Sequence, residues 1–274
     1  IVTSFAQLPS RERLARYRAV IQPAVWKLTR KQRSRIFQNL SVPDILKQVL
    51  QGYEVIYETR ASYSPREYCV QYRESDFAFL SRLMEQEGIY YFFKQGEDGD
   101  KMVIGDTPAS HSDTPGESRI VYDDLEGGGR DETRIFNWSK TQNWDSGKCT
   151  LRDYYFETPR TNLQTQKEIL PNVQVGRVAH QMSVGANCPD LEVYDYPGGY
   201  TAKAYGDHLV KTGMQQIEAA QFVIRGESNV FNLIPGYRFA LERHPNADGQ
   251  YLVTSVTHSA SEGAFHSTDD GAGV

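Results

Sequence analysis

Hydrophobic positions along this chain follow two periods, and the clearest change from one to the other lies near residue 75. Residues 67–73 alternate apolar and polar positions, as a half-buried strand does. Ser75 is a good N-cap, Gly88 is a typical helix stop, and residues 89–93 form a short apolar and aromatic run. The apolar positions between the cap and the stop recur every three or four residues: Phe77, Leu80, Leu83 and Met84. The pattern predicts a β-α-β unit.

A second helix is predicted just before this unit. Ser41 and Asp44 form a capping-box pair, Pro43 is tolerated in a first helical turn, and Gly52 closes the segment. Strands are predicted at residues 53–60 and 101–105, with a hairpin loop at 96–100. Together these elements predict a small α+β module.

Outside this module the pattern favours strands. Residues 16–28 read as one β segment bent at Pro23, and the last two predicted strands form a hairpin. Residues 160–187 have no clear assignment, and a polar tail begins at residue 259. One further helix is predicted over 207–225, with an apolar stripe that ends at Ile224 and a stop at Gly226. The predicted strands after residue 132 are 133–142, 148–157, 191–196, 237–242 and 250–258.

Composition is consistent with a globular chain. It has 274 residues, of which 39% are hydrophobic and 12% aromatic, enough for real cores. No apolar run reaches the roughly 18 residues of a membrane helix, and the first residues lack a signal-peptide core. The chain does not begin with Met, so we expect a piece of a longer protein. Three widely spaced cysteines predict neither a disulfide framework nor a zinc site.

Charge is unevenly distributed. Residues 11–35 carry nine Lys or Arg against one Glu, but they lack interleaved stacking aromatics, so we favour a solvated or partner-facing surface over nucleic-acid binding. The acidic loop at 96–100 lacks the twelve-residue calcium pattern. Residues 123–132 contain three consecutive glycines without phosphate-loop spacing, which predicts a flexible connector.

The sequence contains no arrangement that predicts catalysis. There is no G-x-S-x-G elbow, and none of the six histidines is three or four residues from another. We therefore predict no catalytic residue, no cofactor and no metal site. The abundant aromatic residues leave a carbohydrate-binding face as an alternative, although packing in strand interiors explains most of them.

The sequence of two stretches, residues 34–93 and 232–258, resembles that of the valine-glycine repeat protein G (VgrG) family, the tip proteins of bacterial type VI secretion. The resemblance covers nearly the whole chain and is weakest between the two stretches. The matching residues are Tyr72-Arg73-Glu74-Ser75-Asp76-Phe77, Phe79-Leu80-Ser81-Arg82-Leu83-Met84-Glu85, Glu87-Gly88-Ile89, Tyr90-Tyr91-Phe92, Asn232-Leu233-Ile234-Pro235-Gly236, Gly249-Gln250-Tyr251-Leu252-Val253 and His258.

This resemblance implies a phage tail hub-like fold: mainly β, with two related antiparallel β-barrel regions and an α+β insert module. Residues 1–30 would end the first barrel, whose opening strands are absent. Residues 31–125 would form the insert. Residues 126–260 would form the second barrel with the helix at 207–225, and residues 261–274 a linker or tail.

The function implied is structural. Such a hub is expected to be a homotrimer in the full-length protein, whose pseudo-sixfold ring adapts a hexameric tube of hemolysin-coregulated protein (Hcp) to a spike. Expected partners are the Hcp tube, spike and baseplate proteins and secreted effectors, without nucleic acid, and the assembly penetrates the target membrane without a transmembrane segment. The protein would reside in the bacterial cytoplasm before assembly and then be injected. Alternatives are the hub of a contractile phage or prophage tail, and a secreted hydrolase or sugar-binding module.

Overall fold

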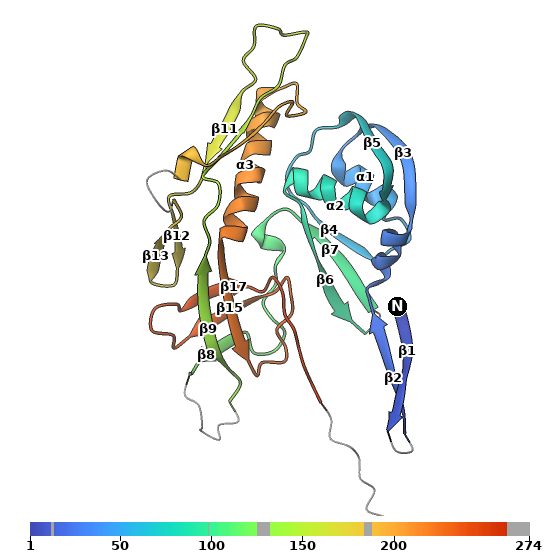
Figure 1. The fold of residues 1–274 in the computed structure, drawn as a ribbon, viewed down its shortest axis with the longest axis vertical. Helices are drawn as coiled ribbons and strands as arrows, with labels where there is room; N and C mark the ends of the chain where they lie inside the picture. Colours follow the sequence, from blue (N-terminus) through green and yellow to red (C-terminus); the bar gives the residue numbers. More distant parts are fainter. Residues whose placement is uncertain (12–13, 98, 125–131, 184–187, 262–274) are drawn as a thin grey trace, which may run out of the picture.

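The computed structural model describes residues 1–11, 14–97, 99–124, 132–183 and 188–261. Two bodies lie side by side, and the helices α2 and α3 approach each other where they meet (Figure 1). The first body and the hairpin that projects from it comprise residues up to about 105. No helix of the described chain is long and apolar enough to cross a membrane.

The chain begins with a projecting hairpin of β1 (Val2–Arg11) and β2 (Leu14–Ile21). The predicted strand over 16–28 is wrong after residue 21, because residues Ala24–Arg30 form the 3-10 helix η1. Pro23 causes the change: it cannot donate to a strand ladder, and its carbonyl accepts the first turn's hydrogen bond from Trp26 N at 3.0 Å.

The predicted α+β elements are confirmed. α1 is capped by Ser41, whose side chain accepts from Asp44 N, and Gly88 ends α2 at φ +72°. Gly52 lies in the turn after α1, beyond its last helical residue. β3 was not predicted, and the hairpin loop is shorter than the predicted 96–100 because β7 begins at Gly99. The elements of this body are β3 (Gln32–Leu40), α1 (Val42–Val49), β4 (Val55–Glu58), β5 (Arg66–Ser75), α2 (Asp76–Glu87), β6 (Tyr90–Gly96) and β7 (Gly99–Gly105).

The helices of this body share one core with two separate small sheets. β3 pairs with β5, while β4, β7 and β6 form a three-stranded sheet. β5 and β6 therefore flank α2 in sequence but lie in different sheets. The core contains Phe79, Leu80 and Leu83 of α2 with Phe37 of β3 and Ile104 of β7.

The second body is built around a five-stranded sheet with the order β15-β9-β8-β16-β17. The predicted 237–258 hairpin is confirmed as the antiparallel pair β16 and β17, although its second strand ends at Leu252. β8 comes from the range expected for the insert, yet it pairs with β9 and β16. The strands are β8 (Arg119–Tyr122), β9 (Arg134–Gln142), β15 (Phe222–Ser228), β16 (Arg238–Glu242) and β17 (Gly249–Leu252).

Three more strands of this body lie within predicted strands, at residues 134–142, 148–151 and 192–195. The other strands of this body were not predicted. The strand predicted over 148–157 ends at residue 151, and residues 160–187 contain three short strands. A smaller sheet has the order β11-β10-β14, and β12 pairs with β13. The elements are β10 (Lys148–Leu151), β11 (Thr165–Glu168), β12 (Asn172–Val175), β13 (Val178–Gln181), β14 (Glu192–Asp195) and the 3-10 helices η2 (Pro108–Ser110) and η3 (Cys188–Asp190).

The mainly β class is confirmed, with two corrections. β8 runs parallel to β9 and to β16, and β10 runs parallel to β14, so these sheets are mixed and not purely antiparallel. The predicted helix over 207–225 is displaced: α3 spans Lys203–Gln221, and the next seven residues form β15. Phe222, Val223 and Ile224 favour a strand and pair with β9. Residues 125–131 of the predicted connector at 123–132 and residues 262–274 of the predicted tail at 261–274 lie outside the described residues.

Candidate assembly surfaces

The three cysteines and three of the histidines have structural roles in this structure. In the described part of the chain, no three His, Cys, Asp or Glu residues gather as a metal site would require. All three cysteines are free and buried. His111 Nδ1 lies 2.8 Å from the Gly236 carbonyl oxygen, and His258 Nε2 lies 2.9 Å from that of Leu233. Ala247 N donates to His244 Nδ1 at 3.1 Å. These histidines hold backbone turns.

The two stretches that carry the family resemblance meet at one joint between the bodies. Gly236 has φ +87°, and a Cβ atom there would lie 2.3 Å from the Phe92 ring of β6. Phe92, Val103 and Tyr237 are buried together. His111 stacks on Tyr90 with 4.9 Å between ring centroids. The glycine is required by both backbone conformation and space.

A second joint is electrostatic and lies between α2 and α3. We call Glu87, Arg66, Tyr205 and His208 the Glu87 cluster. Arg66 Nη2 lies 2.6 Å from Glu87 Oε1, the Tyr205 hydroxyl donates to the same oxygen at 2.7 Å, and His208 Nε2 lies 3.4 Å from Glu87 Oε2. The Glu87 side chain is 6% exposed, so its charge is compensated almost entirely by this cluster. Burial, and then the bond to Glu87, raise the pKa of Tyr205, which keeps it a donor.

The β1–β2 hairpin is a two-stranded sheet that exposes apolar side chains. Phe5 and Tyr17 stack with 5.5 Å between ring centroids, and both rings remain more than half exposed. Ile21 is 72% exposed. A lone two-stranded hairpin is marginally stable in water, so this one needs further contacts to be covered.

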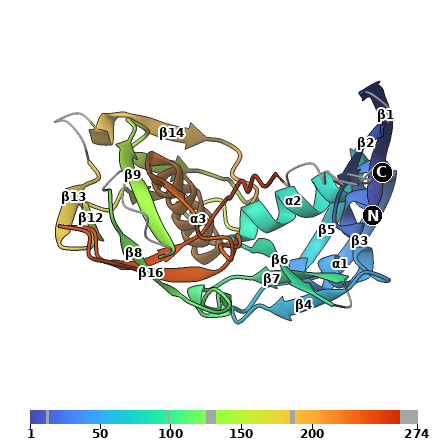
Figure 2. The ribbon, with the colours of Figure 1, turned by 90° about the horizontal axis from the view of Figure 1, so that it is seen from below.

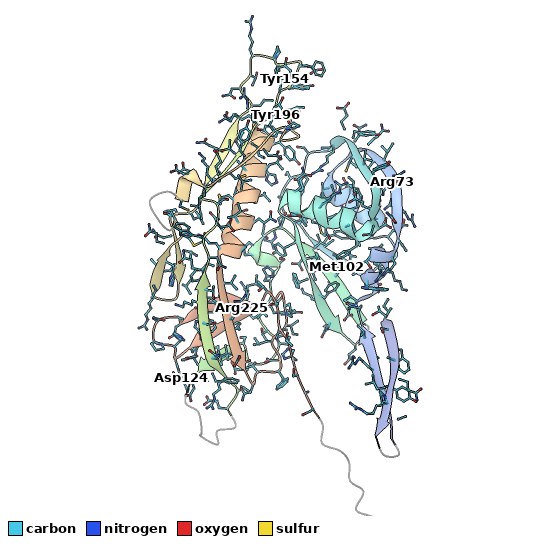
Figure 3. The ribbon with its side chains drawn as sticks, in the orientation of Figure 1. Arg73, Met102, Asp124, Tyr154, Tyr196 and Arg225 are labelled. Carbon is cyan, nitrogen blue, oxygen red and sulfur yellow. The ribbon has the colours of Figure 1, made fainter. Side chains whose placement is uncertain are left out.

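The outer face of the β3–β5 pair is a second exposed surface. Its apolar side chains alternate along β5 with those that enter the core, as the strand period requires. Arg73 has φ +50°, a conformation uncommon for residues other than glycine, and its guanidinium carbon lies 5.2 Å from the centroid of the Tyr72 ring. Figure 3 shows Arg73 on the outside of the first body. The exposed members of this face are Ile36, Tyr68, Val70 and Tyr72.

Sequence reasoning found β2, β5 and α2, but it predicted neither β1 and β3, which complete these two surfaces, nor the surfaces themselves. The exposure of Tyr68, Val70 and Tyr72 follows from the alternation in β5, once the buried Cys69 and Gln71 fix which face is inside. The Glu87 cluster gave no signal in the sequence, because Arg66 and Tyr205 are 139 residues apart.

A family model described as the phage tail baseplate hub (GPD) matches residues 1–264. The chain belongs to this hub family. Among proteins with a curated description, the type VI secretion system spike protein VgrG1c of Pseudomonas aeruginosa is 33% identical over 279 aligned residues. That alignment covers 100% of this chain and 37% of the spike protein, so the chain spans little more than a third of that relative's length. The resemblance to VgrG proteins is confirmed.

Solved structures support the hub fold at much lower sequence identity. The E. coli c3393 protein, described as a component of the type VI secretion system similar to T4 phage tail proteins gp27 and gp5, superposes with a TM-score of 0.57 at 17% identity. The superposition covers 89% of this chain and 50% of the c3393 protein. A tail protein from Neisseria meningitidis gives a TM-score of 0.61 at 11% identity, covering 92% and 72%.

Proposed function

We propose that this chain is the structural hub region of a type VI secretion tip. The observation that carries the proposal is the 33% identity to the spike protein VgrG1c along the whole chain. In the full-length protein, three copies would form a ring that adapts a hexameric Hcp tube to a spike. Three subunits can match a sixfold partner only if each contributes two similar surfaces.

The exposed surfaces support a role in assembly. A hub must contact neighbouring subunits, a tube, spike and baseplate proteins, and secreted effectors, and it does so through exposed apolar faces. The β1–β2 hairpin and the outer β3–β5 face are surfaces of that kind. The proposed role is mechanical and uses no catalytic residue or cofactor. The protein would wait in the bacterial cytoplasm and be injected with the assembled tip.

The test uses the full-length protein. We expect light scattering to give the mass of a trimer, and Hcp rings to retain the protein in a pull-down. A Phe5→Asp and Tyr17→Asp variant should lose assembly, whereas Arg177→Glu, an exposed change on another surface, should not. A protein that stays monomeric and ignores Hcp rings would contradict the proposal.

A second candidate is the hub of a contractile phage or prophage tail. It is favoured by the fold likeness to the Neisseria meningitidis tail protein, although the sequence identity is only 11%. Neighbouring genes distinguish the two. Sheath, tube and assembly-ATPase genes of the secretion type support the first, and capsid and terminase genes support the second.

A further inference from the structure

An open cleft lies at the end of the second body farthest from the β1–β2 hairpin. Its volume is about 570 Å³, and its walls are the loop after β10 and the strand β14. Three tyrosines line it: Tyr154, Tyr194 and Tyr196 are 59%, 53% and 55% exposed. Figure 3 shows Tyr154 and Tyr196 together at this extremity. Three half-exposed aromatic rings around one hollow are the composition of a binding surface.

The strand β14 beside this cleft has an open edge. It is the outermost strand of the order β11-β10-β14, and it lies at the periphery of the molecule (Figure 2). Gly147 N donates to the Leu191 carbonyl oxygen and Arg152 N to that of Asp195, so these alternate carbonyls face β10. The backbone groups of Glu192 and Tyr194 therefore face outward. An exposed row of N–H and C=O groups is a template for another strand.

The cleft also offers positive charge that the protein does not use. Arg152 and Arg160 both line it, and neither forms an ion pair with any residue that the structure describes. Asp153 is the one carboxylate among the lining residues, and its Oδ2 is held by Gly199 N at 2.6 Å and Tyr200 N at 3.0 Å. Two guanidinium groups thus remain for a ligand, in a geometry suited to carboxylates.

We propose that the open edge of β14 and this cleft bind an extended acidic segment of a partner protein. The segment adds a strand to β14 through Glu192 and Tyr194, and its alternate side chains enter the cleft between the tyrosines. Its carboxylates bind Arg152 and Arg160. This goes beyond the proposed hub role, since it requires neither a trimer nor a tube.

The strand edge is what favours a peptide over an acidic sugar chain. Tyrosines and arginines serve both ligands, but only a polypeptide places N–H and C=O groups at the spacing of β14. The partner's charge follows from the two free guanidinium groups. Electrostatic complementarity of this kind sets specificity more than affinity.

The experiment uses the chain of 274 residues and a fluorescent synthetic peptide of about eight residues, in which Val and Tyr alternate with Asp and Glu. Fluorescence anisotropy measures binding. We expect saturable binding that falls with added salt, no binding of the matched peptide with Lys in place of the acids, and at least about tenfold weaker binding for Arg152→Glu or Arg160→Glu. Arg177→Glu is the matched control and should bind as the parent does.

A second arm tests the strand edge without changing the protein. The peptide is N-methylated at alternate residues on one edge or on the other. One of the two versions should lose binding and the other keep it, because only one edge faces β14. Equal binding of both versions, equal binding of the Lys peptide, or undiminished binding by both arginine variants would each overturn the proposal. So would binding of a sulfated oligosaccharide with failure of the acidic peptide.

Discussion

At the residue scale, the buried carboxylate of Glu87 is the centre of the ion pair and hydrogen bonds between the two bodies. It binds side chains from β5 and from α3 at once, so that one charge joins the two bodies. The exposed pair of Arg82 and Glu74 has similar distances, but Arg82 is 45% exposed. Burial decides which pair matters, because water screens the exposed one.

We expect Glu87→Gln to lower the free energy of unfolding by about 3 kcal/mol, since Arg66 would remain largely buried without its counter-charge. Glu74→Gln is the matched control and should cost less than about 1 kcal/mol. Urea denaturation of both variants measures the difference. Equal losses would mean that the Glu87 cluster is not a structural ion pair.

His244 makes the turn between β16 and β17 sensitive to pH. Burial, and then the nearby charge of Lys140, lower the pKa of His244 below its usual value of about 6.5. The neutral ring is thus favoured by folding, so its contribution is complete above about pH 6.5 and is lost as the pH falls through the folded pKa. Protonation at Nδ1 would remove the acceptor of Ala247 N.

We expect the parent chain to lose stability between neutral pH and about pH 5 more steeply than a His244→Asn variant. The asparagine oxygen keeps an acceptor close to the position of Nδ1 but does not titrate in this range. Thermal unfolding across this pH range measures the two slopes. Identical slopes would show that His244 does not titrate with folding.

At the element scale, local signals were reliable and non-local ones were not. The caps at Ser41 and Ser75 and the stop at Gly88 act within a few residues, so the sequence predicted α1 and α2 correctly. The prediction of a helix up to Arg225 was wrong because Ile217 and Ile224 keep a helical spacing across the boundary between α3 and β15. Phe222–Ser228 form a strand because they pair with β9, which lies some eighty positions earlier in the sequence.

The joint at Gly236 gives a prediction for a close approach between elements. Gly236→Ala should cost at least about 2 kcal/mol more than Gly52→Ala, because overpacking adds to the backbone strain. Gly52 has nearly the same φ, +88° against +87°, but a Cβ there would meet nothing within 4 Å. Denaturation of the two variants isolates the contact with Phe92. Equal costs would leave only the backbone term.

At the scale of the whole molecule, two cores, one in each body, are connected by a small hydrophobic cluster, and two further clusters lie around α3. The first contains residues from Val25 to Ile104, and the second is built mainly on the five-stranded sheet. Phe92, Val103 and Tyr237 bridge them. The division into an insert and a second barrel stays a prediction. β8 lies in the range expected for the insert but pairs with a strand of the second body, so composition alone could not place the boundary. Composition could not show the cleft either, since its lining comes from the loop after β10 and from β14, about forty positions apart.

We expect the two bodies to unfold together. Trp26 reports on the first body and Trp138 on the second, and each can be isolated by replacing the other two tryptophans with Phe. The two urea transitions should coincide in the parent chain and separate when Glu87→Gln and Gly236→Ala are combined, because both joints are then weakened. Separate transitions already in the parent would contradict this coupling.

The contact between Gly236 and Phe92 also limits how such proteins can be recombined. The two residues belong to stretches more than a hundred positions apart, yet Gly236 cannot gain a side chain unless Phe92 moves. A chimera that takes residues 232–258 from a relative inherits the turn without the ring that it was fitted to. Exchanges between hubs should therefore succeed when both stretches come from one parent, and the natural unit of exchange is the pair.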